Sequence, residues 1–399
     1  MTELYLLEPD PPGAAWAPFA GVRPVAGLRA GLWPIRERWE RALGLRAKAV
    51  VGAHCEGFAE GDEPPCVGAP PAARPAIVAA SWFAPAARRI EVARDIRRLV
   101  HDGATVGWVV REGEPFDPTA RPEPAAPVAG VLLRGAWGLL DALERLLADD
   151  CASFALAGRG AAPPDAVVLG DPSLVVSLGA SVEPGVVFDV RHGPVVLDAE
   201  AEVRSGTRLE GPVYVGPRTR ILGGFIRESV FGPECRARGE IASSVFLGYA
   251  NKAHEGFVGH SVLGCWVNLG AGTTTSNLKN TYGPVRLEVG GERIETGRLN
   301  VGTLFGDHAK TAIGTLLATG TVIGAGANVF GAPPVPKYVA PFAWGASGER
   351  MSEEGFLRIA ERVMPRRAVE VTPARREALR RLYARALGAR AADARAAGR

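Results

Sequence analysis

Glutamine is absent from this chain of 399 residues, and lysine and asparagine are scarce. Cysteine is scarce too, and none of the five forms a C-x-x-C pair, which argues against a disulfide framework or a zinc knuckle. No uninterrupted apolar run reaches the roughly 18 residues of a membrane span. The N-terminus lacks the basic segment of a secretory signal. We therefore expect a cytoplasmic protein with no membrane partner.

The overall composition is that of a folded protein. Hydrophobic residues make up 47% of the chain and charged residues 22%, so extensive disorder is excluded. A formal net charge of +3 is too small to indicate a nucleic-acid partner. The length predicts two or three domains of roughly 100–200 residues each.

The scarce residue types gather in one region. All six asparagines lie between 251 and 328, and four of the five lysines lie between 252 and 337, together with three of the six histidines. Arginine, alanine, glycine and proline dominate elsewhere, so this clustering favours a region whose side-chain chemistry is specified. The alternative is that asparagine only marks turns.

The first 158 residues read as a mixed α/β domain, followed by a linker at 159–165. Apolar and charged residues alternate with helical spacing in three segments, and short apolar runs between them predict buried strands. The expected helices are 33–43, 87–100 and 136–150, and the expected strands are 49–51, 75–83 and 105–110.

From residue 166 the apolar residues repeat every six positions. A period of six fits neither an α-helix nor a hairpin, but it fits a triangular parallel β-helix in which one aliphatic residue per face points inward. We expect this fold over 166–345. The repeating positions are Leu197, Val203, Leu209, Val215 and Ile221, then Cys235, Ile241 and Leu247, then Phe257, Leu263 and Leu269, then Leu317, Ile323, Val329 and Val335.

Two segments depart from the repeat. Residues 276–300 read as a loop with a hairpin at Gly290-Gly291, and a long excursion from a rigid scaffold is often functional. Residues 346–399 form an arginine-rich tail that is predicted to be helical over 352–364 and 373–396. We interpret this tail as a solvated cap rather than a nucleic-acid patch.

The stretch NKAHEGFVGHSVLGCWVNLGAGTTTSNLKNTYG (251–283) resembles the acetyltransferase domain of GlmU, the bifunctional UDP-N-acetylglucosamine pyrophosphorylase/glucosamine-1-phosphate N-acetyltransferase. The segments at 23–39, 306–315 and 335–345 resemble a bacterial branch of GlmU-like sugar nucleotidyltransferases. The resemblance implies a reduced nucleotidyltransferase-like domain followed by a left-handed β-helix acyltransferase domain. It also implies acetyl-CoA as co-substrate, an amino-sugar phosphate as acceptor and a homotrimer.

Acetyl transfer to an amine needs a base and a donor for the thioester oxyanion. By resemblance, His254 aligns with the base, and Asn268 and Asn277 align with residues that hold the sugar or position the reacting groups. Ala271 and Gly272 lie in the turn that offers a backbone N–H to the acetyl carbonyl. The alternatives are a structural histidine and asparagines stacked in a ladder.

Further residues are candidates for substrate binding. Four residues are expected to supply positive charge to the phosphate of the sugar or of coenzyme A: Lys252, Lys279, Arg220 and Lys310. Asp307 and His308 form a second polar cluster with Lys310, in which His308 would act as a second base or contact a neighbouring subunit. Two departures leave the acceptor sugar open: Phe257 stands at the family's tyrosine, and the family's phosphate-binding lysine falls near Ser243.

The N-terminal domain lacks the G-x-G-T-R loop of active nucleotidyltransferases. If the domain acts on UTP with Mg²⁺, Arg23, Arg29 and Arg36 would form the phosphate-binding cluster. The metal ligands would then come from Glu8, Asp10 or Glu37. The alternative is a degenerate domain that only supports the β-helix.

Three other functions remain open. A zinc enzyme on the same fold would use His254, His260 and His308, although their spacing differs from that of γ-type carbonic anhydrases. A non-catalytic scaffold is the second alternative. An acyltransferase for a different amino sugar or sugar nucleotide is the third and main alternative.

Overall fold

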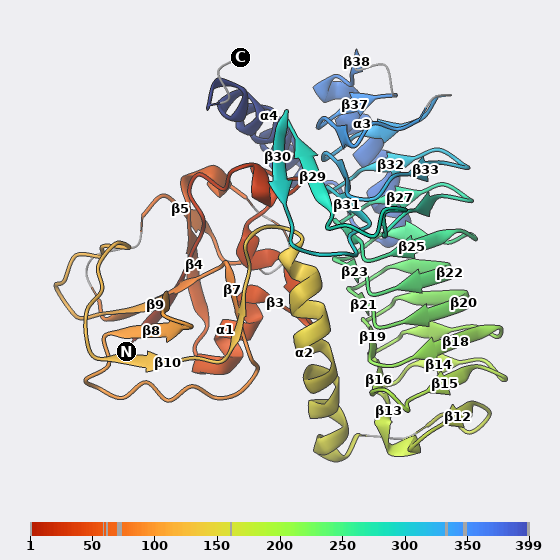
Figure 1. Cartoon of the computed structure of the whole chain (residues 1–399), viewed down its shortest axis with the longest axis horizontal. Coiled ribbons are helices and arrows are strands. Elements are labelled where there is room, and N and C mark those ends of the chain that lie inside the picture. Colours follow the sequence, from red (N-terminus) through yellow and green to blue (C-terminus); the bar gives the residue numbers. More distant parts are fainter. Residues whose placement is uncertain are drawn as a thin grey trace.

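The computed structural model describes residues 2–58, 60, 63–69, 74–159, 162–331, 334–345 and 349–396. It confirms an N-terminal α/β region, a left-handed parallel β-helix and a helical tail, which Figure 1 shows in this order from red to blue. The linker expected at 159–165 includes residues 160 and 161, which lie outside the described part of the chain.

A seven-stranded sheet forms the centre of the N-terminal region, in the order β10-β8-β9-β6-β1-β4-β5. Two pairs, β11-β7 and β2-β3, lie beside it. The bounds are β1 (Glu3–Leu7), β2 (Arg29–Ala30), β3 (Trp33–Pro34), β4 (Ala47–Val51), β5 (Cys66–Val67), β6 (Ala76–Ala80), β7 (Phe83–Pro85), β8 (Arg98–His101), β9 (Ala104–Val110), β10 (Ala125–Pro127) and β11 (Gly130–Leu132).

Two of the three helices expected in this region are present. Helix α1 (Ile35–Leu43) ends at Gly44, whose φ of 65° allows the left-handed cap, and α2 (Gly138–Phe154) is the second. The helix expected at 87–100 is wrong. Its C-terminal part is instead strand β8, which pairs with β9, and Ile90 donates its N–H to the carbonyl of Ala42. Sheet pairing therefore overrides the helical spacing.

The β-helix has three faces. Strands β20 and β22 bend around one corner, so that each contributes to faces one and two. Face one also holds β14 (Ser181–Val182), β17 (Glu202–Val203), β24 (Asn251–Lys252), β27 (Asn268–Leu269), β32 (Lys310–Thr311), β35 (Asn328–Val329), β37 (Ala343–Trp344) and β38 (Glu349–Arg350). Face two holds β12 (Val167–Leu169), β15 (Val187–Asp189), β18 (Thr207–Glu210), β20 (Arg220–Arg227), β22 (Arg236–Ala242), β25 (Phe257–Gly259), β28 (Thr274–Thr275) and β33 (Leu316–Leu317).

The inward positions form the core that the six-residue period predicts. Leu197, Val215 and Ile221 are fully buried, as are Leu263 and Ile323. Two positions are wrong. Phe257 is only partly buried and its neighbour Val258 points inward, and Phe246 instead of Leu247 continues the inward column between Phe231 and Leu263.

Face three is buried on both sides. It consists of β13 (Val175–Ser177), β16 (Val195–Leu197), β19 (Val213–Val215), β21 (Val230–Phe231), β23 (Val245–Phe246), β26 (Val262–Leu263), β31 (Thr303–Phe305), β34 (Thr321–Ile323) and β36 (Tyr338–Val339). Its outward residues, such as Val196, Tyr214 and Val245, share one hydrophobic core with α2 and the N-terminal sheet. Figure 1 shows α2 between the two halves. Neighbouring residues in these strands are therefore both apolar, because one packs inside the prism and the next packs against the N-terminal half.

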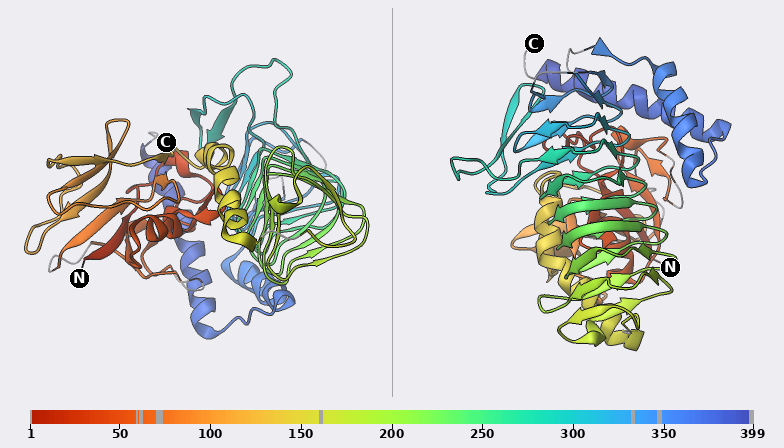
Figure 2. Two further views of the ribbon diagram at one scale, coloured as in Figure 1. Left: turned by 90° about the horizontal axis from the view of Figure 1, so that it is seen from below. Right: turned by 90° about the vertical axis from the view of Figure 1, so that its right-hand side faces the viewer.

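The excursion carries the predicted hairpin, β29 (Arg286–Val289) and β30 (Glu292–Glu295), with positive φ at Gly290 and Gly291. The tail forms α3 (Glu353–Val363), a 3₁₀ turn η6 (Met364–Arg367) and α4 (Pro373–Ala396), as expected. The Ser352 side chain caps α3 by accepting the N–H of Gly355. Figure 2 shows α4 running between the two halves of the molecule. Among the described helices, none has the length and apolar content to cross a membrane.

Candidate functional site

A ladder of polar residues runs along face one. Parallel pairing places Asn251, Asn268, Lys310 and Asn328 at equivalent positions on successive coils. Asn251 Nδ2 donates to Asn268 Oδ1 at 2.9 Å. The register also places Arg220 on this ladder, where it pairs with Glu202 at 3.1 Å. Three of the six clustered asparagines and one of the clustered lysines thus lie on one face of the prism.

A pocket of about 240 Å³ lies between this ladder and the C-terminal tail. Its aromatic wall is the stacked pair Tyr249 and Trp266, whose ring centroids are 4.3 Å apart. Its polar lining comes from Asn251, Asn268, Lys310, Arg366 and Arg367. Two of these residues, Asn268 and Lys310, are expected site residues, and the structure brings them together.

His254 lies at the corner between faces one and two, and its side chain is exposed. The turn is anchored from inside, because the buried Lys252 Nζ donates to the carbonyl oxygens of His254 at 2.6 Å and Arg238 at 2.7 Å. Lys252 therefore points into the prism, away from the surface at which substrate binding was expected. Burial lowers the pKa of Lys252 to about 8, and Glu255 opposes this shift.

This shifted pKa predicts a pH-dependent contribution of Lys252 to stability. Between pH 8 and 10.5 the unfolded chain holds more protons at this lysine, so the free energy of unfolding rises with pH. At about 1.4 kcal/mol per pKa unit, the rise is up to about 3 kcal/mol. Relative to Lys252→Met, the wild type should gain stability over this window in urea titrations. A difference that stays constant with pH would contradict the assignment.

The turn on the next coil carries Ala271 and Gly272. Gly272 donates its N–H to Glu255 O at 2.9 Å, which places this turn directly against that of His254. The Ala271 N–H has no hydrogen-bond partner within the described part of the chain. Of the two backbone groups expected to face an acetyl carbonyl, Ala271 is thus the one with a free donor, and it lies beside His254.

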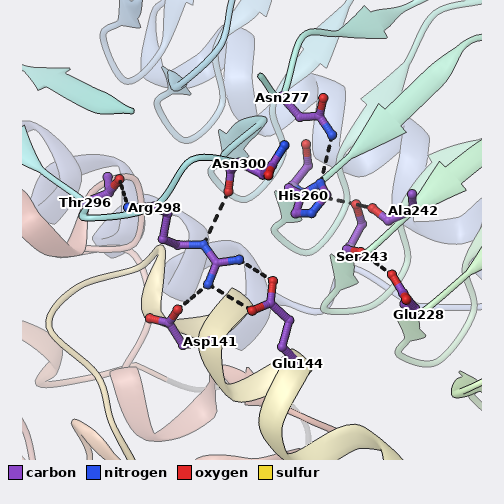
Figure 3. Close-up of polar contacts among 12 residues, drawn as sticks. Asp141, Glu144, Glu228, Ala242, Ser243, His260, Asn277, Thr296, Arg298 and Asn300 are labelled. Atoms are coloured by element: carbon purple, nitrogen blue, oxygen red, sulfur yellow. Dashed lines mark hydrogen bonds and ion pairs between the residues drawn. The ribbon is translucent and has the colours of Figure 1, made fainter. Parts of the chain in front are cut away.

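Asn277 lies at the far end of face two. Its Nδ2 donates to Nδ1 of His260 at 2.8 Å, and Figure 3 shows this pair near Arg298. Burial, together with Arg298, lowers the pKa of His260, which favours the unprotonated nitrogen that accepts this bond. A single chain therefore does not gather His254, Asn268 and Asn277 into one pocket among the described residues.

Arg298 fastens the excursion to the N-terminal region. Its guanidinium pairs with Asp141 and Glu144 of α2, as Figure 3 shows, and its Nε donates to Asn300 O at 3.3 Å. Lys279 lies in the same excursion, partly buried.

Asp307 and His308 lie under the tail. Asp307 accepts the N–H of Cys265 at 3.0 Å, and His308 stacks on Trp266 and meets the edge of Phe356. Burial, then Lys310 and Arg23, hold the pKa of His308 well below its ordinary value. The structure thus gives both residues packing partners within the chain, away from the exposed corner of His254.

The three N-terminal arginines do not form one open cluster. Arg23 pairs with Asp307 and Glu60, each at 2.7 Å, and Arg36 pairs with Glu40 at 3.0 Å and Glu63 at 3.1 Å. Arg29 donates to the carbonyl of Leu32 instead. Carboxylates therefore already neutralise two of the charges expected to bind nucleotide phosphates.

The residues expected to bind Mg²⁺ do not fit the ion. Glu8 accepts the N–H groups of Val25 at 2.6 Å and Ala26 at 3.0 Å, so its oxygens are already occupied. Asp10 accepts the N–H of Ala53, and Glu37 pairs with Arg36. Across the described residues, no three His, Cys, Asp or Glu side chains are grouped to hold a metal ion. This leaves His254, His260 and His308 without a zinc-site geometry.

Comparison with known proteins agrees with this architecture. The family model described as sugar nucleotidyl transferase matches residues 6–157. The bifunctional sugar-1-phosphate nucleotidylyltransferase/acetyltransferase of Sulfurisphaera tokodaii is 35% identical over 150 residues, covering 35% of each chain. Over part of its length the chain is therefore similar to sugar nucleotidyl transferases. The bifunctional protein GlmU of Methanococcus vannielii is 33% identical over 85 residues, covering 21% of this chain and 20% of that protein.

A third relative is the GlmU of Acaryochloris marina, which is 25% identical over 166 residues, covering 41% of this chain and 32% of that protein. The chain thus aligns with about a third or less of the length of these relatives. The name of the Sulfurisphaera tokodaii protein describes a nucleotidylyltransferase and acetyltransferase.

Sequence reasoning missed the tail residues of the pocket, Arg366 and Arg367, and the aromatic pair Tyr249 and Trp266. The spacing of the aromatic pair could have indicated that the two rings stack, because Tyr249 and Trp266 are one coil apart, as are Asn251 and Asn268. No sequence pattern indicates the position of the tail arginines, because it depends on how the C-terminal tail packs against the β-helix.

Proposed function

We propose that this protein transfers an acetyl group from acetyl-CoA to the amine of an amino-sugar phosphate such as glucosamine 1-phosphate. The observation that carries this proposal is the corner where the exposed His254 lies beside the free N–H of Ala271. A base and an oxyanion donor on adjacent coils are the two groups that acyl transfer to an amine requires.

The proposed reaction starts with the substrate ammonium. An imidazole nitrogen of His254 takes one proton from it, and the amine nitrogen attacks the thioester carbon. The Ala271 N–H donates to the oxyanion that forms at the carbonyl oxygen. The carbon–sulfur bond then breaks and the coenzyme leaves as a thiolate. The attacking nitrogen gives up a second proton, which the thiolate takes, and keeps the acetyl group as an amide.

The acceptor would lie along face one, where Asn268 begins the strand β27 that leads into this corner. Asn277 is too far around the prism to act in the same pocket of one chain, so we propose a homotrimer in which a second copy contributes to the site. Two strongly exposed apolar residues beside the corner, Ile313 (79%) and Leu316 (70%), suit such an interface.

An assay with acetyl-CoA and glucosamine 1-phosphate tests the proposal by release of free thiol and formation of the N-acetyl product. Turnover that depends on both substrates supports it. If thiol is released only with another amino sugar or a sugar nucleotide, that compound is the acceptor instead of glucosamine 1-phosphate. Absence of turnover with every amine tested would overturn the acetyltransferase assignment.

We expect the N-terminal domain not to form a nucleotide sugar from UTP and N-acetylglucosamine 1-phosphate. Arg23 and Arg36 are neutralised by carboxylates, and Glu8 is bonded to backbone N–H groups. Pyrophosphate release with Mg²⁺ present should therefore stay at the level of a protein-free control. Release at a rate comparable to acetyl transfer would contradict this expectation and restore the bifunctional assignment.

A further inference from the structure

The C-terminal tail returns to the β-helix through a sharply defined turn. Helix α3 runs into η6, and Ala368 adopts a left-handed conformation with φ of 54°. Its N–H donates to the carbonyls of Met364 and Pro365, and the Met364 side chain is buried against the body of the protein. This turn fixes Arg366 and Arg367 over the polar ladder of face one.

The pocket beneath this turn carries an excess of positive charge. Lys310, Arg366 and Arg367 line it, and no carboxylate is among its described lining residues. Arg236, one coil further along the ladder, lies close enough to lower the pKa of Arg367, after the larger effect of burial. Glu234 is the nearby acid, and it already pairs with Arg218 and Arg236.

The cationic groups also have unused hydrogen-bond donors. The buried Nε of Arg367 has no partner within the described structure. Among the described residues, Lys310 Nζ donates only to the carbonyl of His308, at 3.1 Å. Lys310 and Arg367 are partly buried, and Arg366 is exposed. Placing like charges together in a partly buried site without a counter-ion costs stability, and an anion with several acceptor oxygens would reduce that cost.

We propose that the tail closes a binding pocket for a phosphomonoester, in which Arg366 and Arg367 act together with Lys310. The side-chain amides of Asn251 and Asn268 supply further polar contacts, and the Tyr249–Trp266 stack forms a wall for the rest of the ligand. The tail is then part of the binding site, in contrast to the solvated cap expected from its sequence.

Two ligands of the proposed reaction carry this chemistry, and naming them rests on the proposed function. One is the phosphate of the amino-sugar acceptor, and the other is the 3′-phosphate of coenzyme A. Calorimetric titrations separate them by comparing glucosamine 1-phosphate with glucosamine, and coenzyme A with 3′-dephospho-coenzyme A. The pair whose affinity depends on the phosphate identifies the ligand.

The variant to test is Arg366→Met/Arg367→Met in the full chain. We expect its Kd for the phosphorylated ligand to rise at least tenfold, because charge-assisted hydrogen bonds are lost. In the acetyl-transfer assay KM should rise in proportion, whereas kcat should change less than threefold. Arg367→Lys should recover part of the affinity. Arg358→Met, an exposed change on α3 outside this pocket, is the matched control.

Inorganic phosphate makes the test independent of the acetylation reaction. The wild type should show a phosphate-dependent rise in Tm that the double variant lacks. If glucosamine 1-phosphate is not acetylated but this difference is present, the proposed function fails and the pocket stands. If the wild type shows no phosphate-dependent rise, or the double variant matches it in both titrations, the pocket is overturned. Lys310→Met replaces the double variant if that protein does not fold.

Discussion

Replacing His254 by alanine is expected to lower the rate of acetyl transfer by about 10²–10⁴-fold, the usual effect of losing a general base. The imidazole is exposed and has no hydrogen bond to other described residues, so its removal should leave Tm within a degree or so of the wild type. Thiol release at saturating concentrations of both substrates measures the effect.

The matched control is His192→Ala, which removes another exposed histidine from an earlier coil of the same β-helix. This variant should keep the wild-type rate. If His254→Ala also turns over within about threefold of the wild type, another group takes the amine proton, and the mechanism centred on this corner is wrong.

Replacing Arg23 by methionine is expected to destabilise the protein by about 3–5 kcal/mol, the typical cost of breaking a buried ion pair from one side. Arg23 is 6% exposed and Asp307 is 2% exposed, and Nε and a terminal nitrogen of Arg23 both donate to the same carboxylate oxygen, at 2.9 and 2.7 Å. The variant leaves the buried Asp307 carboxyl with the N–H of Cys265 as its one remaining hydrogen-bond partner among the described residues. Urea unfolding measures the loss.

Arg46→Met serves as the control for this experiment. Arg46 also pairs with a carboxylate, that of Glu40 at 3.3 Å, but its side chain is 87% exposed. Such a surface pair contributes about 0–1 kcal/mol, so its removal should have little effect. A loss below about 1 kcal/mol in Arg23→Met would show that this ion pair does not hold the two halves together.

The β-helix was predictable from the sequence because its core repeats. Leu197 and the following inward residues recur every six positions, and each is buried by the coils on either side. The hairpin was predictable for a local reason, since Gly290 and Gly291 both take the positive φ that the turn requires. The β-helix and its hairpin could therefore be predicted from local periodicity and from the residues that turns require.

Contacts between distant segments could not be predicted in this way. Arg23 and Asp307 are separated by 284 positions, and nothing near either residue indicates the other. Lys252 occupies an inward position because two carbonyls accept its ammonium hydrogens, which a hydrophobic pattern does not reveal. The segment at 87–97 has helical spacing, but the adjacent sheet offers its end a pairing partner.

The same distinction between local patterns and distant contacts applies to the candidate site. Composition indicated the region, and Asn268 and Lys310 were both expected site residues. The ladder that joins them to Asn251 follows only from the pairing of the coils. The tail arginines were not expected, because their position depends on the packing of α3 and η6 against the coils. Residues of a tail that packs back onto the β-helix lie outside its six-residue repeat, so the repeat does not predict where they lie.

Face three has a consequence for how the protein can be divided. Because the outward residues of its strands lie in one core with α2, cutting the chain between the two halves would expose a continuous apolar stripe along the length of the prism. Either fragment produced alone would present this stripe to water and tend to aggregate. The roles of the two halves are therefore best tested by point substitution in the intact polypeptide, and truncation is an unsuitable way to separate them.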